Sequence, residues 1–231
     1  GPGEETSWQL PPLPFDSEPI DVSPQKSLSV GSVTEGRLYN AVRIDLPRPH
    51  LSIAATQRER GLNYTTARLA DAIQTAADYT ARNDSGRTTY LGNASAKYGG
   101  DIPYSVSHNS GRDIDVVFFA EDKRGEQVIP TDLITFDANG ETTSDGKRIY
   151  FDVSANWWFV EGLLEKSDVA LEFIFVSEAL KAKLLDYARA NNRPASVIQR
   201  AARILHQPSN APPHADHFHI RIHCTRREVT A

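Results

Sequence analysis

The amino-acid sequence predicts a single α+β domain. Stretches with the alternating pattern of strands are interleaved with stretches of helical periodicity. Hydrophobic residues make up 39% and charged residues 24% of the 231 residues, a composition that supports an ordinary buried core. The chain contains no internal repeat and no low-complexity segment. We therefore expect these strands and helices to pack around one hydrophobic core.

Residues 1–25 differ in composition from the rest of the chain. They hold six of the fourteen prolines and five acidic residues, without a lysine or an arginine. We expect residues 1–25 to form an extended acidic leader, whose first three residues resemble the remnant of a protease-cleaved tag. The remaining 25 acidic residues equal the 25 basic residues, so the leader carries the whole net charge of −5. Residues 26–231 are the predicted catalytic domain.

The first half of this domain begins with strands and ends with a strand. Short alternating stretches between Ser27 and Leu46 predict strands joined by turns. An amphipathic helix follows from Thr65 to Arg82, with Thr65 or Thr66 able to cap its first turn. Residues 113–119 end in a run of four apolar side chains and predict a strand that enters the interior.

In the second half, a turn-rich insertion between short strands is expected at residues 136–146, because Asp, Asn and Gly are concentrated there. Helical patterns and apolar or alternating runs then follow one another. They predict a helix over 152–166, a strand over 169–176, a helix over 178–191, a helix beginning at Pro194 and a strand over 217–224.

Composition excludes several classes of protein. No apolar run approaches the roughly 18 residues of a membrane helix, so we expect no transmembrane segment. The net negative charge argues against a nucleic-acid partner. The single cysteine, Cys224, cannot form an internal disulfide or a four-thiolate metal site. Any metal site must therefore use His, Asp or Glu, and we expect Cys224 to be buried and inert.

Four of the seven histidines lie within residues 214–223. If residues 217–224 form a strand, His217, His219 and Arg221 point to one face, and the intervening apolar residues point to the other. The apolar face is expected to pack on the core, leaving the two imidazoles in a cleft. The alternative is a solvated polar face that is rich in histidine.

A second group of polar residues surrounds His108 and Asp115. Gly111 permits a tight turn, which would bring His108 back toward the strand that carries Asp115. A carboxylate that enters such an apolar strand needs a compensating charge, and a cation supplies one. His108, Asp115 and one histidine of the pair His217 and His219 would form a set of three nitrogen and oxygen ligands. Three such ligands plus water are typical of catalytic zinc sites.

The chain also resembles the penicillin-insensitive murein endopeptidases, a family of LAS-type zinc metallopeptidases. The matching blocks keep their order over roughly residues 26–226. They are Gly99-Gly100, Ser107-His108-x-Ser-Gly-x-x-x-Asp115, Phe151-Asp152-x-x-x-Asn156-Trp157, Phe175-Val176-Ser177, Leu205-His206-Gln207-Pro208 and His214-x-Asp216-His217-Phe218-His219-Ile220-Arg221.

This resemblance implies a fold, a site and a reaction. The fold would be a central, mainly antiparallel sheet flanked by helices, as in LAS, hedgehog and D-Ala-D-Ala carboxypeptidase domains. Zinc, one ion per chain, would be held by His108, Asp115 and His219. The catalytic pair would be His217 and His214, whose division into base and acid stays open. The reaction would be hydrolysis of D-Ala to meso-diaminopimelate cross-links in peptidoglycan by a metal-activated water.

Two residues are candidates for binding the substrate. Arg221 lies on the same strand face as the histidines, where it would hold a substrate carboxylate or pair with a carboxylate of the site. Tyr104 precedes the His108 loop and is a candidate for a substrate groove.

The resemblance places the protein in the periplasm, exported after removal of a signal peptide, with cross-linked muropeptides as its partner. Two alternatives remain open. The protein could be a zinc D,D-carboxypeptidase that trims peptidoglycan stems, or a metal-binding or wall-binding module without catalysis.

Overall fold

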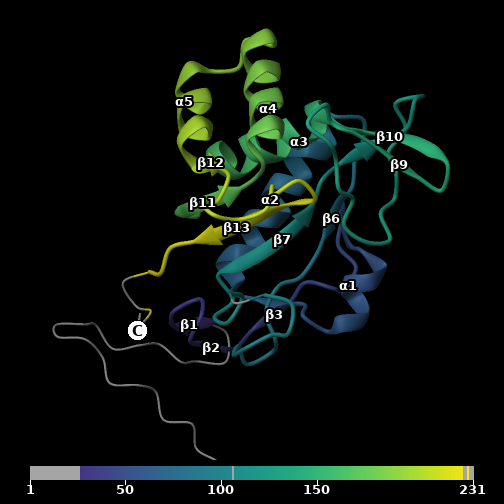
Figure 1. Ribbon diagram of the computed structural model, residues 1–231. Coiled ribbons are helices and arrows are strands. Elements are labelled where there is room, and N and C mark those ends of the chain that lie inside the picture. Colours follow the sequence, from purple (N-terminus) through teal and green to yellow (C-terminus); the bar gives the residue numbers. More distant parts are fainter. Residues whose placement is uncertain (1–26, 106, 226–227, 229–231) are drawn as a thin grey trace, which may run out of the picture.

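A mixed six-stranded sheet forms the centre of the computed structural model, which describes residues 27–105, 107–225 and 228 (Figure 1). The strands are β4 (Leu51–Ile53), β6 (Thr89–Leu91), β7 (Asp113–Val117), β11 (Leu171–Phe175), β12 (Leu205–His206) and β13 (His217–Ile222). Their order is β12-β11-β13-β7-β6-β4. The three inner pairs are antiparallel and the two outer pairs are parallel, which confirms the mainly antiparallel sheet.

The two central strands, β7 and β13, carry both the core and the polar residues of interest. On β13, Phe218, Ile220 and Ile222 are fully buried, as the alternation predicts. The ring of Phe218 meets that of Phe118 edge to face at a centroid distance of 4.8 Å. Because successive side chains alternate, this apolar face leaves His217 and His219 on the opposite side of the sheet.

Helices cover the sheet, with α2 running behind β7 and β13 in Figure 1. The helix predicted from Thr65 to Arg82 is confirmed as α2 (Ala67–Asn83). Of the two possible caps it is Thr66 whose hydroxyl accepts a hydrogen bond from the Leu69 N–H, at 3.3 Å. Helix α4 begins after Ser177, and α5 follows Pro194. The helices are α1 (Ala55–Arg60), α2 (Ala67–Asn83), α3 (Val153–Glu161), α4 (Glu178–Ala190) and α5 (Ala195–Ile204).

The helix expected over residues 152–166 is present, but only its first part is α-helical. After α3 the chain continues as the π-helical segment η1 (Gly162–Lys166). Gly162 lies against α2, where an added Cβ would come within 3.0 Å of the Ala76 Cα. The close packing of these two helices therefore needs a residue without a side chain at this position.

The predicted insertion at residues 136–146 is a turn followed by a hairpin that joins a small separate sheet. Asp137 closes the turn, since its carboxylate accepts the N–H groups of Asn139 and Glu141 at 2.9 and 3.0 Å. The strands of this sheet are β8 (Ala120–Glu121), β9 (Glu141–Ser144) and β10 (Lys147–Phe151).

Short strands also form at the start of the described chain, as predicted for residues 27–46. They pair as two small antiparallel ribbons, β1 (Leu28–Gly31) with β2 (Gly36–Tyr39) and β3 (Val42–Arg43) with β5 (Tyr64–Thr65). The leader predicted for residues 1–25 lies outside the described residues. Among the helices of the described chain, none has the length and apolar character needed to cross a membrane. The described residues form one α+β domain, as the sequence predicts.

Candidate active site

The antiparallel pairing of β7 with β13 brings a carboxylate and an imidazole together. Asp115 lies directly opposite His219 in the ladder, and Asp113 lies opposite Arg221. Both aspartates and His219 are buried. Residues opposite each other on neighbouring strands have adjacent side chains on the same face. The register therefore places these four polar side chains on one face of the sheet, as two adjacent cross-strand pairs.

A loop of irregular backbone brings His108 to the same face of the sheet. His108 has a φ of +70°, a left-handed conformation that residues with a side chain adopt infrequently. Gly111 also has a positive φ of +76°, and an added Cβ there would lie 2.6 Å from Leu38. The expected turn at Gly111 is thus confirmed. It returns His108 to the strand, where its Nε2 lies 3.4 Å from the Asp115 Oδ1.

The Asp115 Oδ1 is surrounded by three imidazoles. It lies 3.4 Å from His108 Nε2, 3.3 Å from His217 Nε2 and 3.7 Å from His219 Nδ1. This buried oxygen has no hydrogen-bond partner in the described chain. Burial opposes its ionisation, but the charges of His217 and His108 outweigh burial and hold the pKa of Asp115 well below its usual range. A buried anion facing three nitrogens at these distances is an environment suited to a cation.

A hydrogen-bonded chain fixes the orientation of His219. Its Nε2 lies 2.7 Å from the Asp113 Oδ1, and the same oxygen accepts a hydrogen bond from Arg221 Nε at 2.8 Å. The Asp113 carboxylate therefore accepts a hydrogen bond from the protonated Nε2 of His219, and the unprotonated Nδ1 is directed at Asp115. A carboxylate behind a histidine is the arrangement that commonly orients a metal-binding imidazole.

His214 and His217 lie on the more exposed side of the cluster, with ring centroids 4.2 Å apart. The Nδ1 of His214 donates to the His217 carbonyl at 2.8 Å, and the Nδ1 of His217 bonds the Asp216 carboxylate at 2.6 Å. In both imidazoles these contacts leave Nε2 as the available nitrogen.

The two imidazoles differ in their electrostatic surroundings. Burial and the nearby charge of His217 lower the pKa of His214 to about 4. Burial would also lower the pKa of His217, but the nearby Asp115 carboxylate, together with the hydrogen bond to Asp216 and the charge of Asp216, reverses this and raises the pKa of His217 to about 10. Two neighbouring histidines thus favour opposite protonation states.

Two groups of side chains in the described chain could hold a metal ion, each with its ligand atoms within 4.8 Å of one another. The first is His108, Asp115 and His219, all buried, and the second is His214, His217 and His219. The first group fits a zinc-type ion better, because it combines two imidazoles with an anionic oxygen that otherwise has no partner. The second group consists of three imidazoles and has no anionic oxygen.

The two candidate substrate residues have structural contacts of their own. Arg221 pairs with Asp113, and its guanidinium lies over the Phe173 ring at 4.6 Å. Tyr104 is half exposed, and the Arg60 guanidinium lies 3.9 Å from the centre of its ring. The ion-pair alternative for Arg221 is therefore present, and substrate binding by either residue stays a prediction.

Sequence reasoning did not assign a role to Asp113 or Asp216, which hold His219 and His217 in orientation. A signal was present in both cases. Asp113 precedes Asp115 by two residues and so shares its face of the strand, and Asp216 adjoins His217.

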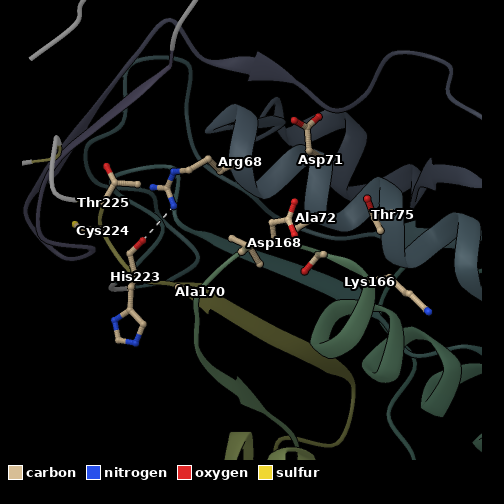
Figure 2. A pocket seen from close by; sticks show the side chains of 12 residues that line it. Arg68, Asp71, Ala72, Thr75, Lys166, Asp168, Ala170, His223, Cys224 and Thr225 are labelled. Carbon is tan, nitrogen blue, oxygen red and sulfur yellow. Dashed lines mark hydrogen bonds between the residues drawn. The ribbon is translucent and has the colours of Figure 1, made fainter. Parts of the chain in front are cut away.

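A cavity of about 460 Å³ lies at the C-terminal end of β13 (Figure 2). Arg68 on α2 donates to the His223 carbonyl at 3.2 Å on one side of this cavity. Cys224 lines it and is of intermediate exposure, so the expectation that Cys224 is buried is wrong. The reason is that β13 ends at Ile222, before the alternation reaches Cys224. Neither potential metal-binding group of the described residues lies here.

Three imidazoles around a buried carboxylate, with a fourth imidazole beside them, form a cluster that could hold a metal ion. The family model of penicillin-insensitive murein endopeptidases matches residues 29–230, and the chain belongs to this family of peptidases that act on murein. A comparison with individual curated proteins found no match.

Proposed function

We propose that the protein is a zinc-dependent D,D-endopeptidase that hydrolyses D-Ala to meso-diaminopimelate cross-links in peptidoglycan. The observation that carries this proposal is the buried Asp115 oxygen, which faces three imidazole nitrogens at 3.3 to 3.7 Å without a hydrogen bond. Membership of the murein endopeptidase family supplies the substrate class. Since murein lies outside the inner membrane, the proposed location is the periplasm.

His108, Asp115 and His219 would hold one zinc ion per chain. Asp113 supports this role, because it holds the second nitrogen of His219 and leaves the first directed toward Asp115. Zinc, when bound, lowers the pKa of water and polarises the scissile carbonyl.

His217 and His214 are the proposed groups for proton transfer. Asp216 holds His217 through Nδ1, which leaves His217 Nε2 to take or give a proton. His214 is held through its own Nδ1 by the His217 carbonyl, so its Nε2 is likewise available. The two imidazoles are in edge contact, and together they can move a proton between the attacking water and the leaving amine.

Two residues are proposed to hold the substrate. Arg221 would contribute the part of its guanidinium that is not engaged by Asp113, toward a carboxylate of the stem peptide. Tyr104 would contribute an exposed aromatic face beside the cation of Arg60.

The decisive experiment is digestion of purified cross-linked muropeptide dimers by the zinc-loaded protein. The proposal expects conversion of dimers to monomers, with a new amine and a new carboxylate at the cleaved bond. Persistence of intact dimers would reject the endopeptidase assignment. Shortened monomer stems with intact dimers would instead indicate a D,D-carboxypeptidase. Binding of murein without any product would indicate a module that has lost catalysis.

A further inference from the structure

The chain segment that carries His214 is a loop whose two ends meet at the end of β11. The His206 carbonyl accepts a hydrogen bond from the Val176 N–H at 3.1 Å, and the His214 carbonyl accepts one from the Ser177 N–H at 2.7 Å. Between these anchors the chain runs over the surface through residues 207–213. Two backbone hydrogen bonds thus hold the ends of the loop together, and the backbone groups between these ends need other hydrogen-bond partners.

The composition of this loop limits the hydrogen bonds that it can make with itself. Pro208, Pro212 and Pro213 have no N–H group, and Asn210 takes a positive φ of +56°. The loop is therefore rich in carbonyl acceptors and poor in backbone donors. A side chain inside the loop must supply donors if the conformation is to be held.

The side chain of Gln207 meets this need from within the loop. Its Nε2 donates to the Pro212 carbonyl at 2.9 Å, with longer contacts to the carbonyls of Pro208 and Ala211 at 3.3 and 3.5 Å. Its Oε1 accepts the N–H of His214 at 2.7 Å. The carboxamide group is the side-chain group that offers a donor pair and an acceptor side by side, so both ends of Gln207 are matched to their partners.

These contacts connect Gln207 to the imidazole of His214. The backbone of His214 is held on one side by the Gln207 oxygen and on the other by the Ser177 N–H. The imidazole is then directed by its own bond to the His217 carbonyl at 2.8 Å. A shift of the His214 backbone would break this last bond and separate the two rings.

We propose that Gln207 is a positioning residue that fixes the backbone of His214 and thereby keeps its imidazole beside His217. Gln207 acts through His214 and has no direct contact with the reacting groups in this role. The inference rests on the proposed function insofar as His214 takes part in proton transfer. The hydrogen bonds themselves are independent of that function.

Two substitutions separate the two ends of the carboxamide. Gln207→Glu keeps the shape and the acceptor for the His214 N–H but replaces the donor by an oxygen that faces carbonyls. Gln207→Met keeps the approximate length and removes both ends. The matched control is Gln199→Glu, which introduces the same charge on the exposed side of α5.

The first measurement is the kinetics of muropeptide dimer cleavage by the zinc-loaded variants. Misplacement of a reacting group by about 1 Å costs on the order of 100-fold in rate. We therefore expect kcat to fall about 10- to 100-fold for Gln207→Met and by less for Gln207→Glu, with KM and zinc content close to those of the parent protein. A purely structural role would lower the melting temperature without this separation of kcat from KM.

The second measurement is hydrogen exchange at the His214 amide, which needs no activity. This amide is expected to exchange at least about 10-fold faster in Gln207→Met than in the parent and the Gln199→Glu control, because it loses its acceptor. Unchanged exchange in Gln207→Met would overturn the inference, as would faster exchange with an unchanged kcat. If the parent protein does not cleave dimers, the proposed function fails, and the exchange result alone decides whether Gln207 holds His214.

Discussion

The two faces of β13 differ in chemistry although they belong to the same six residues. One face carries Phe218, Ile220 and Ile222, which are fully buried in the core. The other carries His217, His219 and Arg221, which contact Asp115, Asp216 and Asp113. Alternation along a strand therefore lets one element anchor the core and the site together.

This arrangement gives the two faces separate consequences. Burial of apolar side chains on one face stabilises the strand and fixes its register with β7. That register determines which polar side chains meet on the other face. Substitutions on the polar face should therefore alter metal binding and turnover, whereas substitutions on the apolar face should alter stability.

Replacement of His219 is the change from which we expect the largest effect. His219→Ala removes a proposed ligand, so zinc affinity should fall by more than about 100-fold, since even the partners behind a ligand are worth about 10- to 100-fold. Muropeptide cleavage should be lost, as it should after treatment of the parent protein with a chelator. Zinc content by mass spectrometry and the dimer digest measure both effects.

The matched control for this prediction is His223→Ala. His223 lies beyond the end of β13 and is more than half exposed. This variant should keep parental zinc content and turnover. If His219→Ala bound zinc as tightly as His223→Ala does, the ligand set would have to be revised.

His217→Ala should separate metal binding from turnover. His217 is excluded from the proposed ligand set, so the variant should retain one zinc ion per chain. Its kcat should fall by about 10²- to 10⁴-fold, the usual contribution of a group that transfers a proton. Loss of zinc together with activity would instead favour the alternative ligand group of His214, His217 and His219.

Asp113→Asn tests the support behind His219. The amide keeps the shape of the carboxylate but loses the charge that bonds His219 Nε2 and Arg221. We expect zinc affinity, measured by competition with a chelator, to fall about 10- to 100-fold. The control is Asp71→Asn on α2. Asp71 lines the cavity at the C-terminal end of β13 and contacts none of these residues, so this variant should leave zinc affinity unchanged. Equal zinc affinities in the two variants would show that Asp113 does not support metal binding by His219.

The parts of the fold that could be predicted from sequence are those with a local signal. The alternation of His217 to Ile222 predicted which side chains pack in the hydrophobic core, and the pair Thr65 and Thr66 marked the start of α2. The approach of His108 to Asp115 followed from a short turn at Gly111. Each of these inferences depends on residues that lie within a few positions of one another.

The parts that could not be predicted depend on contacts between distant segments. The bond between Asp113 and His219 joins residues 106 positions apart and requires the register of β7 and β13. The wrong expectation for Cys224 has the same origin, because β13 ends at Ile222, which pairs with Leu171, the first residue of the distant strand β11. The hydrogen bonds of Gln207 likewise depend on how its loop closes on β11.

The smallest effect is expected from a conservative change on the apolar face. Ile220→Val removes one methylene from a fully buried side chain, which should lower the free energy of unfolding by about 0.5 to 1.5 kcal/mol. Because the ladder to β7 is unchanged, zinc content and kcat at a temperature well below unfolding should equal those of the parent. Thermal unfolding of the zinc-loaded protein measures the first quantity. A large loss of kcat in Ile220→Val would show that packing on the core face adjusts the site directly, and the separation between the two faces of β13 would fail.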